Sequence, residues 1–117
     1  MPFRIGADEE RRARLERELA RMISLFPQLG IKKAILFGSL ARGDVTETSD
    51  IDLILVKETA DTFSDRLEQA LVALDPRVGL DVLVYTPVEY EEMLQTVPFL
   101  QNAVREGRVI YEAGSCR

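Results

Sequence analysis

The chain has 117 residues, no histidine, one cysteine and a formal net charge of -5. Its length is typical of a single domain, and the lack of histidine excludes Ser-His-Asp and Cys-His catalysis within the chain. The lone Cys116 excludes an internal disulfide and a Cys-rich zinc site, and the acidic balance argues against broad nucleic-acid binding. No stretch approaches the roughly 18 apolar residues that span a bilayer, so we expect one cytoplasmic domain over residues 1–117.

The N-terminal region is predicted to be an amphipathic helix. Apolar residues recur at helical spacing from Asp8 to Phe26, with Asp8 placed to cap the helix and Pro27 placed to end it. Glutamates interleave with the arginines between Arg11 and Arg21, so we interpret this face as solvated rather than as a nucleic-acid surface.

Strands and helices alternate through the rest of the chain. Apolar runs predict buried strands over residues 33–37, 51–56 and 79–85, and helical spacing predicts a helix over 62–74. The segment Thr86-Pro87-Val88-Glu89 has the pattern of a capping box and predicts a helix, interrupted at Pro98 and ended by Gly107. Residues 109–111 can add an edge strand, and about 113–117 are expected to form a loose tail.

Two aspartates open a strand that otherwise has a buried pattern. Asp50 and Asp52 stand at the start of the run Ile51–Val56, although Asp is disfavoured in strands. Side chains at positions i and i+2 of a strand point to one face, about 6.5 to 7 Å apart at the backbone, so both carboxylates can converge on a divalent cation. The alternative is that Asp50 caps a turn and Asp52 faces water at the strand end.

A glycine and a serine stand between the first predicted strand and a short helical stretch. Gly38 lets the backbone approach a phosphate, and Ser39 supplies a hydroxyl donor beside exposed N–H groups. The alternative is an ordinary turn capped by the serine.

Together these segments form a recognisable pattern. Gly38-Ser39, Ala41-Arg42-Gly43 and Ser49-Asp50-Ile51-Asp52-Leu53 follow one another within residues 38–56. This order resembles the signature of the nucleotidyltransferase superfamily typified by DNA polymerase beta, and the short chain is similar to its minimal nucleotidyltransferases. The resemblance implies an α/β (α+β) fold with a small mixed sheet backed by helices. It also implies a third carboxylate on a following strand, for which Asp81 is the matching position; solvation of a strand end is the alternative role.

The resemblance further implies the reaction. A nucleoside monophosphate, AMP in the first instance, would pass from ATP or another nucleoside triphosphate to an acceptor, with Mg²⁺ or alternatively Mn²⁺ as cofactor. The implied catalytic and metal-binding residues are Asp50, Asp52 and Asp81, and the implied nucleotide-binding residues are Gly38, Ser39, Arg42 and Ser49. For Arg42, a phosphate contact and a loop-fixing role both remain open.

A partner is implied in the same way. Many stand-alone minimal nucleotidyltransferases are antitoxins of a small helical toxin of the HEPN type, so we expect such a partner. A small-molecule nucleotidyltransferase completed by another subunit and a non-catalytic module that masks a partner are the alternatives. Tyr90, Met93 and Phe99 are candidate partner contacts, with core packing expected for at least two of them.

Overall fold

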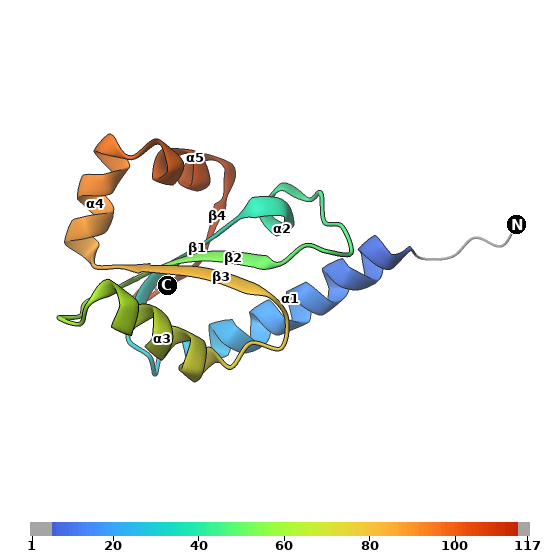
Figure 1. The fold of residues 1–117 in the computed structure, drawn as a ribbon, viewed down its shortest axis with the longest axis horizontal. Helices are drawn as coiled ribbons and strands as arrows, with labels where there is room; N and C mark the ends of the chain where they lie inside the picture. Colours follow the sequence, from blue (N-terminus) through green and yellow to red (C-terminus); the bar gives the residue numbers. More distant parts are fainter. Residues whose placement is uncertain (1–5, 115–117) are drawn as a thin grey trace, which may run out of the picture.

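The computed structural model describes residues 6–114 and shows a twisted sheet with helices on both faces (Figure 1). The strands are β1 (Ile31–Phe37), β2 (Ile51–Lys57), β3 (Leu80–Tyr85) and β4 (Arg108–Glu112). The helices are α1 (Ala7–Leu25), α2 (Gly38–Arg42), α3 (Phe63–Leu74), α4 (Pro87–Thr96) and α5 (Pro98–Glu106). The predicted mixed sheet backed by helices is confirmed.

The sheet has the strand order β3-β2-β1-β4. β1 pairs antiparallel with both β2 and β4, whereas β2 and β3 pair in parallel through the crossover helix α3. The two central strands carry the longest apolar runs because helices cover both of their faces. The predicted edge strand near residues 109–111 is confirmed as β4.

Two hydrophobic clusters separate the faces of the sheet. On one face, α1 and α3 pack against β2 through Leu53 and Leu55, with Leu15 and Met22 of α1 in the same cluster. On the other face, Ile54 and Val56 pack with residues of α4 and α5. Side chains alternate along a strand, so Asp52 points to the same face as Ile54, toward α5.

Local sequence signals set most element boundaries. The capping box is present: the Glu89 N–H donates to the Thr86 hydroxyl at 3.1 Å, and the Thr86 N–H donates to the Glu89 carboxylate at 2.9 Å. The prediction that Asp8 caps the first helix is wrong, because the helix begins earlier, with Gly6 as its N-cap. Asp8 lies instead in the first turn, where an acid favours the positive end of the helix dipole. Of the predicted tail, residues 115–117 lie outside the described residues.

Within residues 6–114, no helix combines the length and the apolar character needed to cross a bilayer.

Candidate functional site

Asp52 and Asp81 stand side by side on neighbouring parallel strands. β2 and β3 pair in a register that sets Asp52 directly opposite Asp81. Partners in a ladder project to the same face, so both carboxylates lie on the α5 side of the sheet. They line a hollow whose other walls are Phe37, Val82, Leu83 and Phe99. The structure therefore brings together two of the three predicted site carboxylates.

The surroundings of Asp52 disfavour its ionised form. Burial, above all, raises the pKa of Asp52 to about 6; the charge of Asp81, a hydrogen bond with Asp81 and the charge of Asp50 act in the same direction. Arg42 opposes the shift. The chain itself therefore places too little positive charge beside Asp52 and Asp81 to balance their negative charge. A bound cation would relieve the repulsion between the two carboxylates.

Gly38 makes room for the Asp52 carboxylate. A Cβ atom at position 38 would lie 2.1 Å from Oδ2 of Asp52, and the Gly38 backbone has a positive φ of 78°. Both the close approach and the left-handed backbone favour glycine. The glycine of the signature is thus tied to the carboxylate pair by direct contact.

Asp50 is held differently from the other two acids. It precedes β2, and its carboxylate lies over Gly79, where an added Cβ would come within 2.1 Å of Oδ1. Oδ1 also accepts a hydrogen bond of 3.4 Å from Arg11 of α1. Within residues 6–114, no three acidic, His or Cys side chains gather closely enough to hold a metal ion together. Asp52 and Asp81 thus lie together, whereas the convergence of Asp50 with Asp52 expected from their i, i+2 spacing is not seen, because Asp50 precedes β2 and is turned toward Arg11.

The predicted nucleotide-binding residues surround the start of α2 and the loop before β2. Arg42 lines a hollow with Gly38 and Asp52, and its Nε lies 3.2 Å from the carboxylate of Asp44. The Ser49 hydroxyl accepts the N–H of Thr46 at 2.8 Å and closes the turn before β2. The carbonyl of Ser39 accepts the N–H groups of Gly43 and Asp44 at 2.9 and 3.1 Å. Their roles toward a nucleotide remain predictions.

Two aromatic residues at the site were not predicted as part of it. Phe37 and Phe99 pack edge to face with their ring centroids 5.7 Å apart, and both line the hollows on either side of Asp52. Phe99 is 50% exposed. The sequence signal for Phe37 is its place directly before Gly38, but α5 reaches the site only through packing of the whole chain.

The arginine-rich face of α1 is also more than a solvated surface. Arg11, Arg12 and Arg14 donate to the carbonyls of Ser49, Gly43 and Arg77, at 2.9, 2.8 and 3.1 Å. The first helix therefore fixes the loops that precede β2 and β3. The interpretation of this face as solvated fits the exposed Arg14, whereas Arg11 is largely covered because the loop before β2 folds back onto the helix.

Comparisons with known proteins identify the family of the chain. Residues 20–115 match the family described as "Polymerase beta, Nucleotidyltransferase". The chain belongs to this family.

Relatives of this nucleotidyltransferase occur in archaea. "Putative protein adenylyltransferase MJ0604" of Methanocaldococcus jannaschii is 42% identical over 84 residues, which cover 69% of this chain and 79% of that protein. "Putative protein adenylyltransferase MJ0141" of the same organism is 29% identical over 80 residues, covering 68% and 80%. A crystal structure described as a "putative nucleotidyltransferase" from Sulfolobus solfataricus has a TM-score of 0.67 at 19% identity, covering 94% of this chain and 91% of that one. This last likeness shows that the fold is shared.

The carboxylate pair of the nucleotidyltransferase fits a divalent cation in its chemistry. Carboxylate oxygens are the ligands that Mg²⁺ and Mn²⁺ prefer, and the pKa of Asp52 is raised first by burial and then by the neighbouring charges of Asp81 and Asp50. Asp52 and Asp81 would hold the ion, and Asp50 lies near enough for its charge to act on Asp52.

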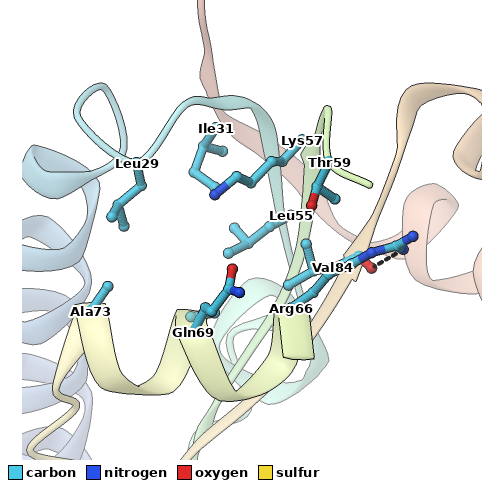
Figure 2. A pocket seen from close by; sticks show the side chains of 10 residues that line it. Leu29, Ile31, Leu55, Lys57, Thr59, Arg66, Gln69, Ala73 and Val84 are labelled. Atoms are coloured by element: carbon cyan, nitrogen blue, oxygen red, sulfur yellow. Dashed lines mark hydrogen bonds between the residues drawn. The ribbon is translucent and has the colours of Figure 1, made fainter. Parts of the chain in front are cut away.

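A second cavity of the nucleotidyltransferase has a volume of about 200 Å³ (Figure 2). It lies between α3 and the end of the sheet at which β1 begins and β2 and β3 end. Its walls include the apolar side chains of Leu29, Ile31, Leu55 and Val84, and none of the predicted site residues lines it. Arg66 donates hydrogen bonds to the Val84 carbonyl at 3.3 Å and to the Glu89 carboxylate at 2.7 Å. This cavity is therefore separate from the predicted site at the Asp52 end of the sheet.

The three candidate partner contacts separate by burial. Tyr90 is buried in the cluster on the α4 and α5 face, and Met93 packs against it. The expectation that at least two of the three serve the core is confirmed. Phe99 alone is exposed, at the rim of the site.

Proposed function

We propose that this nucleotidyltransferase is a metal-dependent adenylyltransferase that moves AMP from ATP to an acceptor protein. The observation that carries the proposal is the in-register pair of Asp52 and Asp81 beside Gly38. The protein acceptor and the choice of AMP are supported by the names of the two archaeal relatives.

The residues around the pair have distinct tasks in this reaction. An acceptor oxygen forms a bond to the α-phosphorus of ATP, the bond from that phosphorus to the bridging oxygen breaks, and pyrophosphate leaves. Asp81, the more exposed member of the pair, takes the proton of the acceptor hydroxyl. Gly38 and Arg42 line the hollow on the other side of Asp52, which suits the triphosphate. A divalent cation bound by the carboxylates supplies neutralising charge at the phosphate oxygens.

The acceptor is proposed to be a small helical HEPN-type protein, toward which this chain acts as the antitoxin. The support is the resemblance to minimal nucleotidyltransferases and the exposed aromatic ring of Phe99 at the rim of the site, which suits a protein surface. A small-molecule acceptor and a non-catalytic masking role remain the competing functions.

The transfer of label from ATP labelled at one chosen phosphate tests the proposal. The full chain is incubated with Mg²⁺ and with the co-expressed product of its neighbouring gene, using ATP labelled at the α-phosphate or at the γ-phosphate. We expect protein-bound label from the α-position only, and its loss in the Asp52→Asn variant. Label from the γ-position would indicate phosphoryl transfer and overturn the proposal. Partner binding without any label would favour the masking function.

A further inference from the structure

The cavity between α3 and the sheet has an apolar floor (Figure 2). Leu55 of β2 and Val84 of β3 are partners in the parallel ladder, and both are buried in this floor. Opposite them α3 presents Ala70 and Ala73, whose i, i+3 spacing puts them on one face of the helix. These two small side chains leave the space of about 200 Å³ over the strands unfilled.

The charged side chains that line this cavity among residues 6–114 are both cations, Lys57 and Arg66. The Arg66 guanidinium is engaged elsewhere, because it donates to both oxygens of Glu89 and to two backbone carbonyls. The half-buried Lys57 forms no ion pair in this part of the chain. Figure 2 shows its side chain extended across the cavity toward Ile31, whereas Arg66 points away. One ammonium group at the cavity is therefore left without a counter-charge in direct contact.

The neutral polar side chains of the cavity wall are already bound to an acid outside it. The Thr59 hydroxyl and the Gln69 amide donate to Oδ2 of Asp61, at 3.2 and 3.1 Å. Asp61 is exposed and does not line the cavity, so water screens its charge. Lys57 is thus the charged donor that a ligand entering the cavity would meet.

We propose that this cavity binds a small ligand with an apolar body and a carboxylate group. The apolar body lies against Leu55 and Val84, and the carboxylate pairs with the Lys57 ammonium. An apolar cavity of about 150 Å³ is large enough to hold benzene, so about 200 Å³ suits one ring with a short acidic side chain. Larger ligands need pockets of about 300 to 1,000 Å³.

The proposed ligand site lies on the opposite face of the sheet from the carboxylate pair. Leu55 belongs to the cluster under α1 and α3, whereas Asp52 shares its face with Ile54, toward α5. The inference therefore goes beyond nucleotidyl transfer and does not depend on it.

Apolar contact and charge make different contributions to this binding. Removing apolar surface from water is non-directional and supplies most of the affinity. The ion pair with Lys57 supplies the preference for an anion. Because Lys57 is only half-buried, water screens the pair in part, and we expect a preference of about fivefold over a neutral ligand of the same shape.

Nuclear magnetic resonance titration of the isotope-labelled full chain with phenylacetate, without ATP or metal, tests the inference. Phenylacetamide is the matched ligand, because it has nearly the same size and no charge. We expect both ligands to shift the amide signals around Leu55, Ala70 and Val84. Phenylacetate should bind about fivefold more tightly.

Substitutions separate the charge of the site from its space. Lys57→Met should abolish the preference for phenylacetate, whereas Lys32→Met removes a nearby charge that does not line the cavity and should retain the preference. Ala70→Leu should fill the cavity and weaken both ligands by about tenfold or more. Val72→Leu, at an exposed position of the same helix, should change neither. Thermal melting checks folding, and Ala73→Leu replaces Ala70→Leu if that variant does not fold.

The contrary outcomes are equally specific. Absence of binding at millimolar ligand, or shifts confined to the surroundings of Asp52, would overturn the inference. Equal affinity for the two ligands would refute the carboxylate class, and undiminished binding in folded Ala70→Leu would refute the cavity as the site. Transfer of label from ATP is measured separately, so the inference and the proposed function fail independently.

Discussion

Two carboxylates of this molecule, Glu18 in α1 and Asp52 in β2, meet opposite electrostatic environments. Glu18 is 8% exposed and accepts two hydrogen bonds from the Arg21 guanidinium, at 2.9 and 2.6 Å, and a third from the Arg77 N–H at 2.7 Å. The Arg21 hydrogen bonds are the main cause that lowers the pKa of Glu18 to about 2. Asp52 instead faces Asp81, and its pKa rises to about 6.

The difference separates an acid that the chain pairs with its own arginine from an acid that it places beside another acid. The chain neutralises Glu18 with its own arginine and ties the end of α3 to α1 in doing so, since Arg21 also donates to the carbonyls of Leu74 and Asp75. Beside Asp52 the chain places a second acid, Asp81. A cation bound at this pair would stabilise the fold. A carboxylate left without compensation is a mark of a ligand-binding site.

Activity should respond most strongly to the difference between the two acids. Asp52→Asn should lower the rate of nucleotidyl transfer by about 10²- to 10³-fold, as expected for loss of a preorganised charge-stabilising group. Glu18→Gln is the matched control, because it makes the same chemical change at the acid that the chain neutralises itself. Steady-state rates with α-labelled ATP measure both, and full activity in Asp52→Asn would refute the assignment.

Substitutions at two glycines probe the space around Asp52. Gly38→Ala should lower the free energy of unfolding by roughly 2–4 kcal/mol, because the new methyl group meets the carboxylate as well as a strained backbone. Gly43→Ala has a similar φ of 88° but no atom within 4 Å of its added Cβ, so it should cost only about 1–2 kcal/mol. Urea unfolding measures both; equal losses would mean that the Asp52 contact adds nothing.

Acid titration tests the ion pair between Glu18 and Arg21. The folded-state pKa of Glu18 is depressed, so its contribution to stability is present above about pH 4.5 and is lost as the pH falls toward about 2. Glu18→Gln should therefore lose about 1–3 kcal/mol of unfolding free energy near pH 7. The difference between variant and wild type should shrink between pH 4.5 and 2, and a constant difference across this range would contradict the ion-pair explanation.

The smallest effect concerns the stability of Asp52→Asn without metal, and it is opposite in sign to the loss of stability expected for Glu18→Gln. Its folded-state pKa is raised, so its stabilising contribution is present below pH 3.8 and is lost as the pH rises through about 6. In a chelator near pH 7, Asp52→Asn should melt at or slightly above the wild type. A ligand at a hundred times its dissociation constant adds about 2.7 kcal/mol of stability, so Mg²⁺ should reverse this order by stabilising the wild type.

Thermal melts with chelator and with Mg²⁺ decide this last point. Glu18→Gln should keep the full magnesium shift although it melts lower throughout. A lower-melting Asp52→Asn with an undiminished magnesium shift would mean that Asp52 is a structural acid like Glu18.

Much of the fold was predictable because its signals are local. The Thr86 capping box, the glycine turns and the alternation along β2 act within a few residues, so the sequence predicted the elements with small shifts at their ends. Asp8 was misassigned because helix starts are the least sharply defined of these signals.

The candidate site was predictable in its residue types but not in its arrangement. The order of Gly38, Asp50 and Asp52 resembles the family signature, and Asp81 followed from the acid inside an apolar strand. The contact of Gly38 with Asp52 and the nearness of Phe99 needed the assembled sheet and α5. Nothing in the sequence distinguished Arg11 from the other arginines of its helix.

The elements, the acids that interrupt apolar strands and the family of the chain could all be inferred from the amino-acid sequence. The meeting of Asp52 with Asp81, and of Asp50 with Arg11, depends on the packed fold. The physical reason is the range of the interactions. Helix periodicity and capping depend on near neighbours, whereas the parallel register of β2 and β3 and the position of α1 depend on packing across the whole core.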